Sequence, residues 1–231
     1  MRTIGLIGGM SWESTAIYYR LVNERVRERA GGLHSARVLL WSFDFDDIAR
    51  MQSAGDWAGA GEALAGAARS LARGGADVIV LCTNTMHKVA DAITAATDLP
   101  FIHLADVTAD AIRAAGCRRP LLLATRYTME DDFYVGRLRE RHGIDAMVPD
   151  AAGRTLVHGV IYDELCRGVV RDASREALLG VVGRARALGA DGVILGCTEL
   201  GMILGRGDCP EPVFDTTGLH AAAAVDFALA A

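Results

Sequence analysis

The sequence contains one short motif twice, and this internal repeat constrains the fold more than any other feature. The motif Gly-Ala-Asp occurs at residues 75–77 and again at residues 189–191, and in both places an apolar segment of strand length follows it. In the ungapped alignment of the two copies, Leu81 lies opposite Leu195. A short apolar run that ends abruptly in polar residues is typical of a buried parallel strand with a functional site at its carboxyl end. The repeat therefore predicts two related halves.

Small polar and reactive side chains follow both apolar segments. The alignment pairs Thr83 with Cys197, Asn84 with Thr198, and Thr85 with Glu199. Two opposed proton-handling groups suit inversion at a tetrahedral carbon, because one removes a proton from one face while the other delivers a proton to the opposite face. A thiol does this when its pKa falls below about 8.5, and we expect a helix N-terminus after the strand to bring it towards neutrality. A threonine hydroxyl is a much weaker acid, so the pair is chemically unequal.

Strand-like and helix-like segments alternate along the chain, which predicts an α/β fold with a parallel sheet in each half. We expect strands near residues 3–7, 38–45, 78–81, 99–103, 119–125, 144–148 and 212–215 and from residue 190, with helices between them. The acidic segment 44–47 is expected to be solvated. A pseudo-twofold pairing of the halves would make the Thr83 and Cys197 strand ends face each other across a cleft, and the turn containing Thr128 is aligned with the turn containing Ser11.

Composition excludes several classes of function. The net charge is −5, and no stripe of Lys and Arg interleaves with aromatic residues, so nucleic acid is a poor candidate partner. No run of about 18 apolar residues is present, which argues against a membrane span, and the N-terminus does not resemble a signal peptide. Five cysteines without regular spacing favour reduced thiols in a cytoplasm over a disulfide framework.

Other interpretations of the reactive residues have less support. The glycines of residues 5–9 suggest dinucleotide binding only weakly, because the full fingerprint is absent. Cys82, His87 and Cys197 lack the paired spacing of metal ligands. Cys82 should point away from the cleft if its strand is regular, although a bulge would reverse this. Three further cysteines are interpreted as buried small hydrophobic residues: Cys117, Cys166 and Cys209.

Two segments resemble the signature motifs of the aspartate/glutamate racemases, which are cofactor-independent amino-acid racemases. They are residues 81–87, with the sequence LCTNTMH, and residues 193–201, with the sequence VILGCTELG. Residues 5–15, GLIGGMSWEST, are similar to the aspartate branch. The resemblance covers essentially the whole chain. It implies a homodimer, a two-base proton transfer without pyridoxal phosphate, metal or nucleotide, and an active site between two α/β domains.

The resemblance also implies domain boundaries and site residues. The first domain is expected at residues 1–98 and 210–231, closed by the C-terminal helix, and the second at residues 99–209. Thr83 and Cys197 take the two catalytic positions, and substrate-binding positions are expected at Met10, Gln52, Asn84, Thr85, Thr128, Thr198 and Glu199.

The chain departs from the family pattern at the first motif. Most members have Cys where this chain has Thr83, with Cys82 one residue early. Because the second-half Cys handles the L-enantiomer in two-cysteine members, the retention of Cys197 predicts a preference for L-substrates. Glutamate racemases carry a His soon after their second Cys-Thr, whereas this chain has Glu199, which favours the aspartate branch or a broader specificity.

The leading hypothesis is therefore a racemase of aspartate, glutamate or a broader set of amino acids, without pyridoxal phosphate. One alternative is a one-thiol isomerase or decarboxylase of a dicarboxylate. Another is a non-catalytic protein that binds an acidic amino acid.

Overall fold

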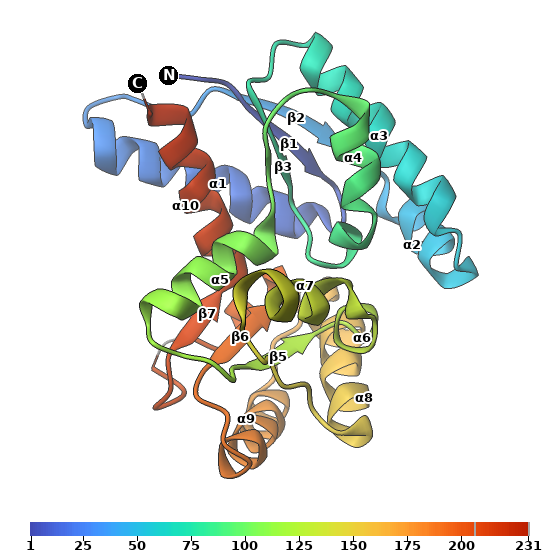
Figure 1. Cartoon of the computed structure of the whole chain (residues 1–231), viewed down its shortest axis with the longest axis vertical. Helices are drawn as coiled ribbons and strands as arrows, with labels where there is room; N and C mark the ends of the chain where they lie inside the picture. The colour runs from blue at the N-terminus through green and yellow to red at the C-terminus, as the bar shows by residue number, and fades with distance from the viewer. Residues whose placement is uncertain (206, 231) are drawn as a thin grey trace. The chain divides into compact units, whose positions relative to one another are not determined.

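The chain folds into two compact α/β units, each built on its own parallel sheet (Figure 1). A computed structural model describes residues 1–205 and 207–230. The first unit contains Met1–His103 and the C-terminal residues from His220, and the second is Leu104–Leu219. The predicted fold class is confirmed in both units. No helix in the described part of the chain has an apolar stretch long enough to cross a lipid bilayer.

The first unit has a four-stranded sheet in the order β2-β1-β3-β4, with all neighbours parallel. Its strands are β1 (Ile4–Gly8), β2 (Val38–Ser42), β3 (Val78–Leu81) and β4 (Phe101–Ile102). Its helices are α1 (Trp12–Ala30), α2 (Phe45–Ala54), α3 (Trp57–Arg73), the 3-10 helix η1 (Thr85–Val89), α4 (Ala90–Ala96) and most of α10 (Thr216–Leu229).

Alternating side chains of β3 pack into separate cores on the two faces of this sheet. Val78 and Val80 pack with residues of α1 and α10, whereas Ile79 and Leu81 pack with residues of α2, α3 and α4. All four side chains are fully buried. A central parallel strand covered by helices on both faces explains why this segment is a continuous apolar run.

The second unit has a three-stranded parallel sheet in the order β5-β6-β7. Its strands are β5 (Leu121–Ala124), β6 (Val193–Gly196) and β7 (Val213–Asp215). Its helical segments are α5 (Leu104–Ala114), α6 (Arg126–Glu130), α7 (Asp132–His142), α8 (Ala151–Gly159), the π-helical segment η2 (Val160–Glu164), the 3-10 helix η3 (Leu165–Arg167), α9 (Asp172–Ala187) and the 3-10 helix η4 (Thr198–Met202).

The repeated Gly-Ala-Asp motif performs the same structural task in both units. The glycine of each copy has φ +93°, a backbone conformation that favours glycine. The Asp77 carboxylate accepts a hydrogen bond from the Thr3 amide at 2.6 Å, and the Asp191 carboxylate accepts one from the Arg119 amide at 2.9 Å. Each aspartate thereby ties the start of its strand to the start of the neighbouring strand. The repeat predicted from the sequence is thus a repeat of structure.

Several boundaries differ from the sequence prediction. The boundaries expected at residues 98/99 and 209/210 would put β4 in the second domain and β7 in the first. In the structure β4 pairs with β3 and belongs to the first unit, and β7 pairs with β6 and belongs to the second. The unit to which a strand belongs is decided by the strand it pairs with, and the sequence pattern predicts strands but not their pairing partners. The strand expected at 144–148 is reduced to one bridge between Met147 and Leu121. The aspartates of the acidic segment are exposed, as expected, but the segment also begins α2, where Asp44 is the N-cap.

Candidate active site

In the first unit, the predicted site begins at the turn after β3. The Cys82 amide still donates to the carbonyl of β1 residue Ile7, at 2.9 Å. The Thr83 amide instead donates to the Leu81 carbonyl two residues earlier, at 2.9 Å, which is the geometry of a tight turn. The Thr83 carbonyl accepts a hydrogen bond from His87 Nδ1 at 2.7 Å. The chain therefore leaves the sheet at Thr83, and this residue is buried to all but 8% of its surface.

Cys82 continues the alternation of β3 and lies in the core formed with α1 and α10. Its side chain is fully buried in the cluster that contains Val80 and Tyr18. Burial raises the pKa of the Cys82 thiol, because no water solvates the thiolate there. The orientation expected for a regular strand is observed, and Cys82 is a packing residue in this structure.

Other predicted residues of the first unit gather close to this turn. Met10 lies in the same apolar cluster as Met86 of η1, and Gln52 of α2 donates from Nε2 to the Met86 sulfur at 3.0 Å. Asn84 and Thr85 stand at the beginning of η1. All four predicted substrate-binding residues of this unit are buried: Met10, Gln52, Asn84 and Thr85. The structure thus groups them with Thr83 at the carboxyl end of the sheet.

The glycine pair after β1 is explained by close packing. Gly9 has φ +83°, and a Cβ atom there would collide with the backbone of Phe43. Its amide donates to the Thr15 hydroxyl at 2.8 Å, while the Ser11 hydroxyl caps α1. The tight approach of the turn to the chain after β2 accounts for the glycine at position 9.

In the second unit, Cys197 stands at the end of β6 beside a buried carboxylate. Its Sγ–H donates to Glu199 Oε2 at 2.9 Å, and the Thr198 hydroxyl donates to the same oxygen at 2.6 Å. Cys197 is 9% exposed and Glu199 is 3% exposed. The turn into η4 brings these three consecutive residues together. Glu199 was predicted to bind substrate, and the structure shows that it also contacts the thiol.

The electrostatics of Cys197 are opposite to the sequence expectation. Burial raises the pKa of its thiol well above the ordinary value, and the negative charge of Glu199 and the neighbouring Cys166 raise it further. The expected lowering by a helix N-terminus does not occur, because η4 is a five-residue 3-10 helix and supplies little dipole. A raised pKa favours the protonated thiol, in keeping with the hydrogen bond that Cys197 donates to Glu199.

The remaining predicted residue, Thr128, lies on α6. It is fully buried, and its hydroxyl is 3.2 Å from the hydroxyl of Thr125, the N-cap of this helix. The strand registers pair Ile7 with Leu81 and Leu123 with Leu195. Position 7 therefore corresponds to position 123, and Ser11 corresponds to Tyr127. The expected alignment of Thr128 with Ser11 was wrong by one residue.

Sequence reasoning missed Tyr162, an aromatic neighbour of the Cys197 site. It lies in the π-helical segment η2, and such segments are frequent at functional sites. Burial raises the pKa of its phenol, and the negative forms of Tyr127, Cys166, Cys197 and Glu199 add to this effect. The Tyr162 ring also packs on His158, with ring centroids 4.6 Å apart. Only the fold brings η2 and η4 together, so no local sequence signal could have found it.

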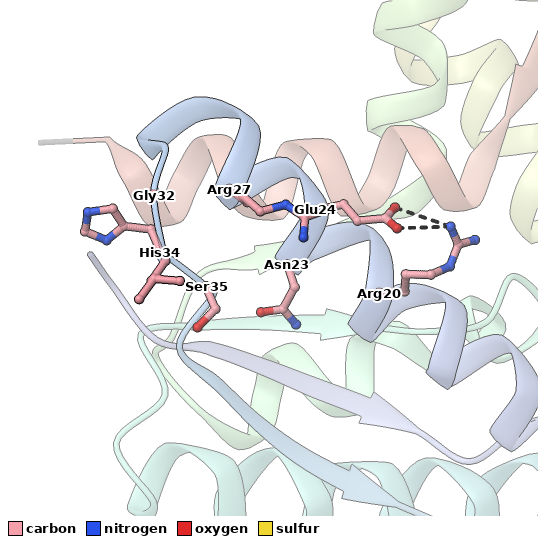
Figure 2. Close-up of a pocket in the computed structure, with 8 residues that line it drawn as sticks. Arg20, Asn23, Glu24, Arg27, Gly32, His34 and Ser35 are labelled. Atoms are coloured by element: carbon pink, nitrogen blue, oxygen red, sulfur yellow. Dashed lines mark hydrogen bonds and ion pairs between the residues drawn. The ribbon is translucent and has the colours of Figure 1, made fainter.

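A surface cavity lies elsewhere, at the C-terminal part of α1 and the loop after it (Figure 2). It contains none of the predicted site residues. Its charged lining is partly paired, since Arg20 donates to Glu24 at 3.3 Å. Across residues 1–205 and 207–230, no three His, Cys, Asp or Glu side chains gather as a metal site would require.

Comparisons with known proteins identify similar chains over nearly the whole length of this one. A family model described as Asp/Glu/Hydantoin racemase matches residues 7–224. A provisional Asp/Glu racemase from Yersinia pestis is 51% identical, with a TM-score of 0.94 and full coverage of both chains. An aspartate racemase homologue from Pyrococcus horikoshii is 32% identical, with a TM-score of 0.86 and 99% coverage of both. Unliganded arylmalonate decarboxylase shares the fold, with a TM-score of 0.54 and 17% identity. The match covers 99% of this chain and 93% of the decarboxylase chain.

Proposed function

Because the chain belongs to the Asp/Glu/hydantoin racemase family, we propose that it racemises an acidic amino acid at Cα without pyridoxal phosphate. The observation that carries this proposal is the buried Cys197 thiol, which donates to Glu199 at 2.9 Å. Such a pair can exchange a proton at one defined position, as a racemase requires on one face of its substrate.

Glu199 is the proton acceptor for Cys197 in this proposal. As the Sγ–H proton moves to Glu199 Oε2, the sulfur becomes a thiolate and takes the Cα proton of an L-substrate. The thiol is thereby restored, Glu199 is protonated and a carbanion remains at Cα. The proton count is complete when Glu199 later releases its proton to solvent. A raised thiol pKa is consistent with this scheme, since a thiolate formed only during the reaction is a strong base.

Thr83 is the proposed group for the other face of Cα. Its hydroxyl donates a proton to the carbanion and regains one from solvent. In the reverse direction it would have to remove a proton from a D-substrate, which a hydroxyl does poorly. The proposal therefore includes faster α-proton exchange on L-substrates than on D-substrates. Because enantiomers have equal free energies, this preference concerns exchange and not kcat/KM for racemisation, which is the same in both directions. The register counterpart of Glu199 at this strand end is Thr85, which cannot accept a proton as a carboxylate does.

The substrate class follows from the groups around the two strand ends and from the relatives. Buried hydroxyl and amide groups suit the α-carboxylate: Asn84, Thr85, Thr128 and Thr198. Met10 and Gln52 are proposed to line the remainder of the substrate site. The aspartate racemase homologue at 32% identity supports aspartate as the first substrate to test, with glutamate second.

Proton NMR in D₂O tests the proposal directly. The purified protein is incubated with L-aspartate, D-aspartate and both enantiomers of glutamate, followed by chiral chromatography. Loss of the α-proton signal together with the appearance of the other enantiomer is expected. If the α-proton of every acidic amino acid persisted, the racemase proposal would be wrong.

A one-thiol decarboxylase of a dicarboxylate is the second candidate. It is favoured by the presence of one thiol with a proton acceptor, because decarboxylation needs proton delivery to one face only. Proton NMR with a malonate as substrate, run in H₂O and not in D₂O, would show a new Cα–H signal and loss of a carboxylate. A protein that only binds acidic amino acids would give neither reaction.

We also propose a homodimer in a reducing cytoplasm. The five free thiols support the reducing compartment, and the dimer follows from the family resemblance. Sedimentation of the purified protein would test the dimer independently of activity.

A further inference from the structure

His87 lies directly behind the Thr83 turn, and its side chain bonds to the Thr83 backbone. The ring nitrogen Nδ1 is 2.7 Å from the Thr83 carbonyl oxygen, and His87 is 4% exposed. A carbonyl oxygen can only accept a hydrogen bond, so Nδ1 must carry the proton. This contact therefore fixes the tautomer of a neutral His87 ring.

Thr83 is consequently held on both sides of its Cα. Its amide donates to the Leu81 carbonyl at 2.9 Å, and its carbonyl accepts from His87 at 2.7 Å. These two bonds limit rotation of both peptide groups that flank Thr83. Because the Cα–Cβ bond follows the backbone, they also fix the direction of Thr83 Cβ and limit the rotamers in which its hydroxyl is presented.

The His87 ring is itself supported by other rings. Its centroid lies 4.6 Å from that of His103, 5.6 Å from that of Phe101 and 5.9 Å from that of His220. His220 is anchored in turn, because its Nε2 donates to the Ile102 carbonyl of β4 at 2.8 Å. The histidine is thus held between the Thr83 turn and the edge strand of its sheet.

We infer that His87 is a positioning residue for Thr83, holding the Thr83 carbonyl so that the hydroxyl keeps the direction needed for proton transfer. This inference rests on the proposed function, in which Thr83 serves the face of Cα opposite to Cys197. A histidine that only filled the core would need no donor aimed at this carbonyl. The loss of the donor should therefore impair the Thr83 step and spare the Cys197 step.

Two isosteric variants separate the donor from the volume of the side chain. In His87→Asn the amide nitrogen occupies nearly the position of Nδ1 and can donate to Thr83. In His87→Leu the shape is similar and the donor is lost. Two rates are measured with L-aspartate in D₂O: formation of D-aspartate, which needs both faces, and deuterium entry into recovered L-aspartate, which needs Cys197 alone.

For His87→Leu we expect racemisation to fall roughly 10- to 100-fold, the effect of a misplaced reacting group. Deuterium entry into L-aspartate should stay within about twofold of the unsubstituted protein. His87→Asn should restore most of the racemisation rate. An unchanged ratio of the two rates in His87→Leu, or an equal loss in His87→Asn, would overturn the inference.

Two further outcomes are also decisive. If His87→Leu does not fold, as judged by thermal unfolding, His87→Gln replaces it, because its donor lies one carbon further from Thr83. A His87→Gln protein with the racemisation rate of His87→Asn would contradict the positioning role. If the unsubstituted protein exchanged no α-proton at all, the proposed function would fail and this inference with it.

Discussion

The strands β3 and β6 begin alike but differ at their carboxyl ends. Both strands begin at a Gly-Ala-Asp motif whose aspartate ties two neighbouring strands. In β3 the first residue after the shared register is Cys82, which is fully buried against α1 and α10. In β6 it is Gly196, where a Cβ atom would lie 2.6 Å from Leu122 Cδ1. The thiol of the second unit, Cys197, comes one position later.

This one-position difference separates a packing thiol from a thiol that contacts a carboxylate. Burial raises the pKa of both thiols. Only the thiol of Cys197 donates to a carboxylate, at 2.9 Å; that of Cys82 is 3.9 Å from a main-chain carbonyl, which cannot take its proton. A buried thiol becomes a base only where a neighbouring group can accept its proton, so position relative to Glu199 matters more than the presence of sulfur.

Replacing Cys197 should have the largest effect. The variant Cys197→Ala removes the base for L-substrates, and we expect α-proton exchange to fall by roughly 10²- to 10⁴-fold, the usual contribution of an acid/base group. Deuterium entry into L-aspartate measures this directly. Near-normal exchange would refute the assignment of the second strand end.

The variant Glu199→Gln tests the acceptor while the side-chain shape is kept. Its amide cannot take the Cys197 proton, so we expect turnover to fall roughly 10- to 100-fold, with a smaller effect than loss of the thiol itself. Removal of the carboxylate charge should also lower the pKa of Cys197, so the remaining activity should rise towards alkaline pH. A rate of the same size and pH profile as the unsubstituted protein would show that Glu199 is not the acceptor.

Making the two ends alike should partly equalise proton exchange on the two faces of the substrate. In Thr83→Cys a thiol replaces the weakly acidic hydroxyl, and we expect deuterium entry into recovered D-aspartate to increase about tenfold. The gain is limited because the nearby position equivalent to Glu199 is Thr85. The rates of deuterium entry into recovered D- and L-aspartate give the ratio. If the D-rate did not increase, the shape of the substrate site would set the preference, and not the weak base.

Much of the fold was predictable because it rests on local pattern. The apolar runs of β1, β3, β5 and β6 were predicted nearly as observed. The helix α2 was missed because its N-cap Asp44 and the acidic first turn look like a solvated segment. The partners of β4 and β7 could not be predicted, since hydrogen bonding between distant segments decides them.

The positions of the candidate residues at the two strand ends were predictable, and their electrostatics were less so. Cys197 and Glu199 follow from the repeat, but the raised thiol pKa depends on burial that only the folded unit creates. The raised pKa of the Tyr162 phenol has the same origin, because η2 is distant in sequence from β6. The hydrogen bond from His87 to the Thr83 carbonyl joins residues only four positions apart. Even so, no sequence pattern distinguishes a histidine that makes such a bond from one that simply lies at the start of a helix.

The dependence of stability on pH tests the buried state of His220 in the first unit. Burial lowers the pKa of His220 from its ordinary value of about 6.5 to about 4. As pH falls below about 6.5 the unfolded chain takes up this proton and the folded chain does not. The free energy of unfolding should therefore decrease between pH 6.5 and pH 4, by about 1.4 kcal/mol per pH unit from this residue, and level off below.

Urea unfolding at pH 7, 6 and 5 measures this slope for the unsubstituted protein and for His220→Gln. The glutamine amide can still donate to the Ile102 carbonyl but does not titrate, so the variant should show a shallower dependence on pH. Equal slopes for both proteins would mean that His220 is not the group responsible.

The smallest effect is expected from Cys82→Ala, the matched control for Cys197→Ala. The substitution removes one buried sulfur atom, and we expect the free energy of unfolding to fall by about 1 kcal/mol from lost packing. Racemisation should stay within about twofold, because Cys82 packs against α1 and α10 and has no proton acceptor such as Glu199. Urea unfolding and the NMR exchange assay measure the two quantities on the same sample. A large loss of exchange with little loss of stability would mean that Cys82 takes part in proton transfer, and the distinction between the two strand ends would then be wrong.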